Sequence, residues 1–160
     1  MFRIPPITKN LLVINILMFC LGGILSNSGV DLNNLLGLHF FKSDSFMLYQ
    51  LFTYMFMHAN FEHIFFNMFA LWMFGRIMEQ AWGAKRYLIF YLVCGIGAGI
   101  CQEVVQYIEY ASEGLANYTM VPNGTVDIPM AQYLDTWTTV GASGAIYGIL
   151  LGFGMTFPNE

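Results

Sequence analysis

The chain alternates between long apolar stretches and segments that are interrupted by polar residues. Four stretches approach the roughly 17–20 mostly apolar residues that a membrane-spanning helix needs, at about 10–25, 61–79, 87–103 and 140–157. This pattern predicts an all-α fold, a polytopic membrane helix bundle with about four transmembrane helices. The first stretch has one alternative, a signal peptide cleaved near Ser26. The later spans need an N-terminal helix to pack against, which favours a span.

Two connecting segments differ in character. Residues 31–50 are apolar but broken by polar side chains, a pattern typical of short helices that lie in the membrane interface. His39 lies in this segment and is expected to be solvated there. Residues 104–139 form a long connection with four acidic side chains, Glu109, Glu113, Asp127 and Asp135.

Composition and charge agree with a membrane location. Hydrophobic residues make up 57% of the 160 residues and charged residues 10%, whereas a soluble domain carries about 25% charged residues. The net charge is −4 and the basic side chains are scattered, so the sequence predicts no nucleic-acid partner. The three cysteines lie inside apolar stretches and indicate no disulfide framework, because cysteine often serves as a small buried apolar residue.

The basic residues predict the orientation of the chain in the membrane. Five of them precede the first stretch or surround the turn after the second, namely Arg3, Lys9, Arg76, Lys85 and Arg86. Lys and Arg concentrate in cytoplasmic loops, so the N-terminus is predicted to be cytoplasmic in a multi-pass integral membrane protein. Segments 26–60 and 104–139 are then expected to face outward. In a bacterium, the membrane would be the plasma (inner) membrane.

Polar residues inside a bilayer are costly and usually face a cavity or a partner. His58 and His63 open the second stretch, and Asn67 follows His63 by one turn on the same helix face. A satisfied polar network and a pair of metal ligands are both alternatives to a catalytic role. A metal is disfavoured, because the two histidines would lie roughly 140° apart around a helix and no third ligand is near in sequence.

The fourth stretch opens with Ser143 between Gly141 and Gly144. The predicted topology places this serine at a depth similar to that of His63, where it could act as a nucleophile beside oxyanion donors. A lone serine among small residues is more often a packing residue. Glycines that recur every four residues also predict a smooth helix face for close packing, Gly144, Gly148 and Gly152. No other stretch of the chain is an obvious partner for that face.

Taken together, these motifs resemble the rhomboid family of intramembrane serine proteases. The resemblance rests on HANFEHIFFN at 58–67, on GASG at 141–144 and on Glu79. It implies that Ser143 is the nucleophile and that His63 and Asn67 stabilise the oxyanion together with the Ser143 amide. It also implies that His58 orders the entrance of the site and that Glu79 links the cytoplasmic helix ends. A Trp-Arg pair common in the family's first outer loop reads Tyr-Gln at 49–50 here.

In that family the general base is a histidine on the last of six spans. The chain ends 17 residues after Ser143, at Glu160. Residues 1–160 are therefore expected to form a partial rhomboid-like membrane domain, with the histidine of the Ser-His dyad beyond its end. Without that base the 160-residue chain is predicted to be inactive.

The function predicted for the whole protein is that of an intramembrane serine endopeptidase. It would cleave transmembrane protein substrates near the outer membrane face, within the lipid bilayer and without a metal or other cofactor. One alternative is a catalytically inactive rhomboid-like protein that binds membrane clients without cutting them. Another is an unrelated four-span scaffold whose polar residues are coincidental. The sequence carries no signal of oligomeric state.

Overall fold

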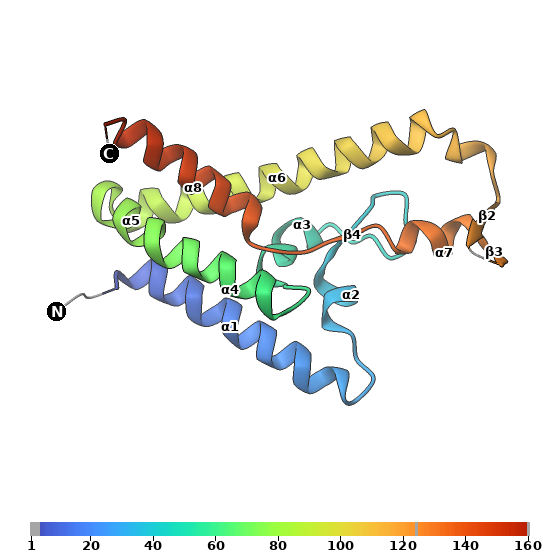
Figure 1. Cartoon of the computed structure of the whole chain (residues 1–160), viewed down its shortest axis with the longest axis horizontal. Helices are drawn as coiled ribbons and strands as arrows, with labels where there is room; N and C mark the ends of the chain where they lie inside the picture. Colours follow the sequence, from blue (N-terminus) through green and yellow to red (C-terminus); the bar gives the residue numbers. More distant parts are fainter. Residues whose placement is uncertain (1–3, 124, 160) are drawn as a thin grey trace.

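The computed structural model describes residues 4–123 and 125–159, and most of them are helical (Figure 1). The long helical segments lie together at one end of the molecule, where α1 begins and α8 ends. The opposite end holds short helices, loops and two small sheets, above which α6 extends. In chain order, the elements of the first half are α1 (Pro6–Ser26), α2 (Leu32–Leu36), β1 (Leu38–His39), α3 (Gln50–Thr53), η1 (Tyr54–Phe56) and α4 (Phe61–Ala70). The second half contains η2 (Leu71–Gly75), α5 (Arg76–Trp82), α6 (Ala84–Ser112), η3 (Leu115–Asn117), β2 (Met120–Asn123), β3 (Val126–Pro129), α7 (Met130–Asp135), β4 (Thr138–Thr139) and α8 (Ser143–Thr156).

The second predicted span forms one helical run, 61–82, with a π-helical turn at its centre. Asn60 starts it by accepting a hydrogen bond from the amide of His63 (2.9 Å), which is a standard N-cap. Gly83 ends it with a φ of +81°, a conformation that glycine adopts at little cost. The run therefore extends three residues beyond the predicted end at Glu79.

Helix α6 is longer than the predicted span of 87–103. Its 29 residues measure about 43 Å at 1.5 Å per residue, whereas the hydrocarbon core of a bilayer is about 30 Å thick. The helix continues past the apolar stretch through Gln102, Glu103 and Gln106, because Glu and Gln are good helix formers in water. The helix is therefore longer than the hydrocarbon core of a bilayer requires.

Two apolar helices, α1 and α6, are each long enough to cross a membrane. Helix α8 is shorter, with 14 residues, and the count of four spans stays a prediction. Large apolar side chains are exposed along the helices, for example Leu17 (61%), Phe66 (66%) and Met155 (75%). Large apolar side chains exposed in this number do not suit contact with water, and they agree with an integral membrane protein.

The mostly helical fold agrees with the expected helix bundle, but the connecting segments also contain two antiparallel strand pairs that this expectation did not include. β2 pairs with β3 as a hairpin, and β1 pairs with β4 through Leu38–Thr139 and His39–Thr138. The β1–β4 pair joins residues about 100 positions apart in sequence, so no local pattern could reveal it. The expectation of a solvated His39 is wrong, since this side chain is fully buried.

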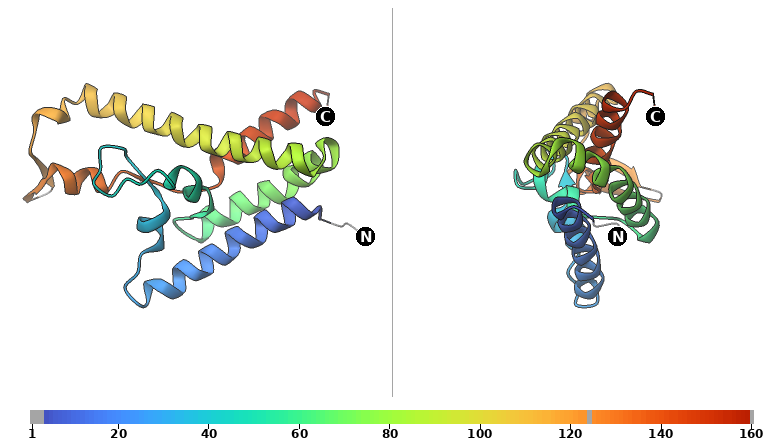
Figure 2. Two further views of the ribbon diagram at one scale, coloured as in Figure 1. Left: turned by 180° about the vertical axis from the view of Figure 1, so that it is seen from behind. Right: turned by 90° about the vertical axis from the view of Figure 1, so that its left-hand side faces the viewer.

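The glycine face of α8 finds its partner within the chain, which corrects the expectation that none of the stretches would match it. Figures 1 and 2 show α8 beside α6. A Cβ atom on Gly148 would lie 2.5 Å from Sγ of Cys94, and one on Gly144 would collide with Cβ of Ala98. Cys94 and Ala98 are themselves small and four residues apart, so two smooth faces meet at close range.

Candidate active site

Ser143 is the first residue of α8. The residue before it, Ala142, supplies no capping side chain, so the first amides of this helix have no partner from their own turn. Gly141 approaches with a φ of +126°, a region that suits glycine alone. Its amide donates a hydrogen bond to the carbonyl of Tyr54 (2.9 Å). This bend and this hydrogen bond place Ser143 at the N-terminus of α8.

His63 lies in the first turn of α4, and its ring faces Gly141. A Cβ atom on that glycine would lie 2.6 Å from Nε2 of His63. The other ring nitrogen, Nδ1, accepts a hydrogen bond from the amide of Ala59 (3.4 Å). A neutral imidazole that accepts at Nδ1 carries its proton at Nε2. The arrangement therefore directs a donor, Nε2–H, toward the backbone that leads into Ser143.

Asn67 lies one turn further along α4, on the same side of the helix as the cavity that Ser143 lines. Both residues line a cavity of about 190 Å³, together with Phe66, Ala70, Ile146, Tyr147 and Leu150. The Asn67 side chain is 8% exposed, and its Nδ2 has no hydrogen-bond partner among the described residues. Buried polar groups are nearly always bonded, so this unused donor is a candidate for binding a ligand oxygen.

His58 precedes α4 instead of lying on it, which corrects the placement of this residue on the span helix. The loop folds back, so that the rings of His58 and His63 meet edge to face with centroids 5.0 Å apart. The carbonyl of His58 also accepts a hydrogen bond from Nδ2 of Asn33 (3.1 Å). Burial, with a smaller contribution from His63, lowers the pKa of His58 from 6.5 to about 4. The ring is thus neutral at physiological pH and packs against His63.

Glu79 lies far from this cavity and binds the start of α1. Its carboxylate accepts hydrogen bonds from the amides of Ile7 (2.9 Å) and Thr8 (2.7 Å) and from the Thr8 hydroxyl (2.8 Å). An anion at a helix N-terminus is favourable because the free amides and the helix dipole both attract it. This geometry fits the predicted structural link between helix ends.

The structure thus brings Ser143, Asn67 and Gly141 together with His63 and leaves Glu79 apart. In the described part of the chain, the rings of His39, His58 and His63 make other contacts, and none accepts a hydrogen bond from Ser143. The same residues contain no cluster of three His, Cys, Asp or Glu side chains that could hold a metal ion.

Tyr54 is a site residue that sequence reasoning missed. Its carbonyl accepts the Gly141 amide, and its hydroxyl donates to the carbonyl of Gly95 on α6 (2.6 Å). It therefore ties the turn before Ser143 to the third long helix. A polar hydroxyl within the apolar run before His58 was the available signal.

Comparison with known proteins agrees with these features. A family model described as the Rhomboid domain matches residues 45–160. The chain is similar to "Rhomboid protease AarA" of Providencia stuartii, with 36% identity over 95 residues, which are 59% of this chain and 29% of that protein. It is also similar to "Rhomboid-like protein 11, chloroplastic" of Arabidopsis thaliana, with 30% identity over 101 residues (63% and 26%). A third relative is "Rhomboid protease GluP" of Bacillus subtilis, with 28% identity over 113 residues (69% and 22%).

A helix bundle with two helices long enough to cross a membrane and large exposed apolar side chains defines the class, an integral membrane protein. The chain belongs to the rhomboid family. Its matches span less than a third of the length of each of these relatives.

Proposed function

We propose that the protein is an intramembrane serine endopeptidase in which Ser143 is the nucleophile. The observation that carries the proposal is the convergence of Ser143, the unpartnered Nδ2 of Asn67 and Nε2 of His63 around Gly141. This convergence supports a site in which Ser143 attacks a scissile carbonyl and the two donors hold its oxygen. Two of the named relatives carry "protease" in their names, which supports the same reaction class.

In the proposed reaction, Oγ of Ser143 attacks the carbonyl carbon of a substrate peptide bond. The carbonyl electron pair moves to oxygen, and the oxyanion accepts hydrogen bonds from His63 Nε2–H, Asn67 Nδ2–H and the first amides of α8. One such donor contributes about 3–4 kcal/mol to transition-state stabilisation. Collapse of the intermediate expels the amine, which takes up the proton removed from the Ser143 hydroxyl, and water then hydrolyses the acyl-serine.

A serine hydroxyl also needs a base to take its proton, and this assistance is worth about 10²–10⁴ in rate. His39, His58 and His63 have other contacts. We therefore assign the base to a histidine outside these 160 residues and expect the isolated chain not to cleave. The substrates would be transmembrane proteins cut near the outer membrane face.

The test is cleavage of a fluorescent transmembrane reporter by the full-length protein in proteoliposomes. We expect cleavage by the wild type, no cleavage by Ser143→Ala, and a milder loss in Asn67→Ala because other donors remain. A fluorophosphonate probe should label the wild type and not Ser143→Ala. Cleavage by Ser143→Ala at the wild-type rate would disprove the nucleophile. Stable capture of the reporter without cutting would indicate a client-binding protein instead.

A further inference from the structure

The strand pair β1–β4 connects the first outer loop to the segment that leads into Ser143. β4 ends at Thr139, four residues before the serine. The contact is tight, since a Cβ atom on Gly37 would lie 2.8 Å from Cγ2 of Thr138 and 3.0 Å from Cγ1 of Val140. Any shift of the first loop should therefore move β4, and with it the start of α8.

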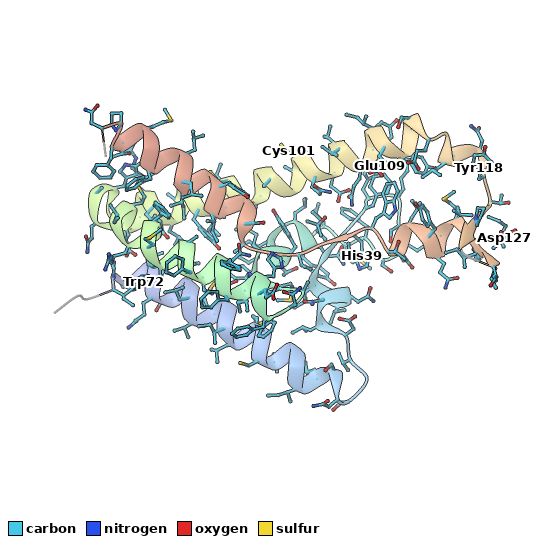
Figure 3. All side chains as sticks on the ribbon, viewed as in Figure 1. His39, Trp72, Cys101, Glu109, Tyr118 and Asp127 are labelled. Carbon is cyan, nitrogen blue, oxygen red and sulfur yellow. The ribbon has the colours of Figure 1, made fainter. Side chains whose placement is uncertain are left out.

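The His39 side chain completes this connection. Its ring is fully buried, with Nε2 2.7 Å from the carbonyl of Asn34 and Nδ1 3.1 Å from Oγ1 of Thr138. A carbonyl oxygen can only accept, so Nε2 donates to Asn34. In the tautomer that carries its proton at Nε2, Nδ1 accepts from the Thr138 hydroxyl. The carbonyl of Asp135, also 3.1 Å from that hydroxyl, is the competing acceptor. Asn34, His39 and Thr138 together form what we term the His39 clamp, and Figure 3 labels its central residue between α2 and β4.

The loop side of the clamp is rigidly held. Gln50 is 1% exposed, and its Oε1 accepts hydrogen bonds from the amides of His39 (3.3 Å) and Met47 (3.0 Å). Its Nε2 donates to the carbonyl of Ser45 (3.0 Å). A buried, fully bonded side chain of this kind fixes one loop conformation.

The same loop also reaches the other half of the candidate site. Asn33, next to the clamp residue Asn34, donates to the carbonyl of His58, whose ring packs against His63. One short loop thus contacts the segment before Ser143 on one side and the support of the oxyanion donor on the other.

We propose that His39 is a positioning residue that sets Ser143 in register with His63 and Asn67 through Thr138. This inference rests on the proposed function. His39 itself does not touch the reacting atoms. A displacement of about 1 Å of a catalytic group can reduce the rate by about a hundredfold, so loss of the bond between His39 and Thr138 should lower kcat while KM changes little.

The experiment uses the full-length protein and compares variants that keep one half of the clamp. In His39→Asn, the amide oxygen can take the place of Nδ1 and accept from Thr138. In His39→Gln, the amide nitrogen can take the place of Nε2 and reach only the Asn34 carbonyl. Thr138→Val removes the hydroxyl but keeps a side chain that suits a strand. Thr136→Val is the matched control, because the exposed Thr136 hydroxyl bonds only the carbonyl of Tyr133.

We expect kcat for reporter cleavage, and the rate of fluorophosphonate labelling, to fall at least about tenfold in Thr138→Val and in His39→Gln. His39→Asn and Thr136→Val should stay close to the wild-type rate. The double variant His39→Gln/Thr138→Val should be no worse than Thr138→Val alone, because Thr138→Val already lacks the bond that His39→Gln removes.

Amide hydrogen exchange at residues 138–145 should increase in the two impaired variants and not in His39→Asn. Wild-type rates in Thr138→Val, or equal rates in His39→Asn and His39→Gln, would overturn the inference while leaving Ser143 as nucleophile. Absence of Ser143 labelling in the wild type would instead overturn the proposed function, and the exchange data would still test the clamp.

Discussion

Gly141 combines a φ of +126° with direct contact to His63, so two separate constraints exclude a side chain at this position. Gly141→Ala should cost about 1–3 kcal/mol in backbone strain. The added methyl group should also displace either the His63 ring or the N-terminus of α8. We expect a loss of at least about a hundredfold in kcat/KM for reporter cleavage.

Gly83 offers a matched control for this variant. It also has a positive φ (+81°), yet a Cβ atom there would meet nothing within 4 Å. Gly83→Ala should lower stability to a similar degree and leave the activity of the folded protein intact. Equal activity losses in the two variants would show that strain alone, and not the contact with His63, explains the effect.

His58 should make stability depend on pH. Burial lowers the pKa of His58 from 6.5 to about 4, so between these values the unfolded chain binds a proton that the folded protein does not. The stability associated with the neutral ring is full above pH 6.5 and is lost as pH falls toward 4. We expect about 2 kcal/mol less stability at pH 5 than at pH 7.5. The apparent Tm in detergent would then fall by roughly 4–8 °C.

His58→Gln provides the comparison, since glutamine does not titrate. The difference in apparent Tm between wild type and variant should shrink as the pH is lowered from 7.5 to 5. A parallel decline of both proteins over this range would assign the acid sensitivity to other groups.

At the scale of elements, sequence patterns located the long helices but not their ends or all of their partners. The apolar stretches marked α1, α6 and α8 because burial in lipid requires long apolar runs. Helix ends depend on capping and on turn geometry, and at Asn60 and Gly83 these set the true limits of 61–82. The β1–β4 pair depends on tertiary proximity across the chain and has no local signature.

The sequence predicts one side of the contact between α6 and α8. The glycine repeat in α8 indicates a close helix partner, but the complementary pair Cys94 and Ala98 in α6 lacks glycine and gives a weaker signal. Both members of that pair are small and one turn apart, which is the same small-residue pattern. The candidate site was likewise predictable only in part. Ser143 and Asn67 can be recognised because they are polar residues in apolar runs. Tyr54 is harder to recognise, because only its hydroxyl marks it in the sequence and its contact with Gly141 uses the backbone carbonyl.

Two glycines on α8 test this packing. Gly148→Ala places a methyl group against Cys94 and should destabilise the protein by about 1–3 kcal/mol through overpacking. Gly154→Ala meets nothing within 4 Å and should stabilise it by up to about 1 kcal/mol through higher helix propensity. Apparent Tm values in detergent measure both. Shifts in the same direction for the two variants would contradict the packed interface.

On the scale of the whole molecule, charge is divided between the two ends. Four of the five described basic residues, Lys9, Arg76, Lys85 and Arg86, lie on α1, α5 and α6 at the end where α1 begins. The fifth, Lys42, is the exception, because it lies over the rings of Phe41 and Tyr110. Glu109 and Asp127 lie at the opposite end, as does Tyr118, whereas Trp72 lies toward the basic end (Figure 3). Sequence alone predicted this division, because it depends only on the order of loops along the chain. The small sheets that organise the acidic end were not predictable in the same way.

This asymmetry leads to a prediction for the orientation in the membrane. Because basic residues remain on the cytoplasmic side, residue 84 should be inside and residue 116 outside. Both are exposed alanines, so Ala84→Cys and Ala116→Cys leave the charge pattern unchanged. They would be introduced singly after replacement of Cys20, Cys94 and Cys101 by alanine. A membrane-impermeant maleimide should label position 116 in intact cells and position 84 only after permeabilisation. The opposite pattern would reverse the orientation. Ser143, the first residue of α8, would then lie near the cytoplasmic face. Cleavage near the outer face would then be untenable, although the proposed role of Ser143 would stand.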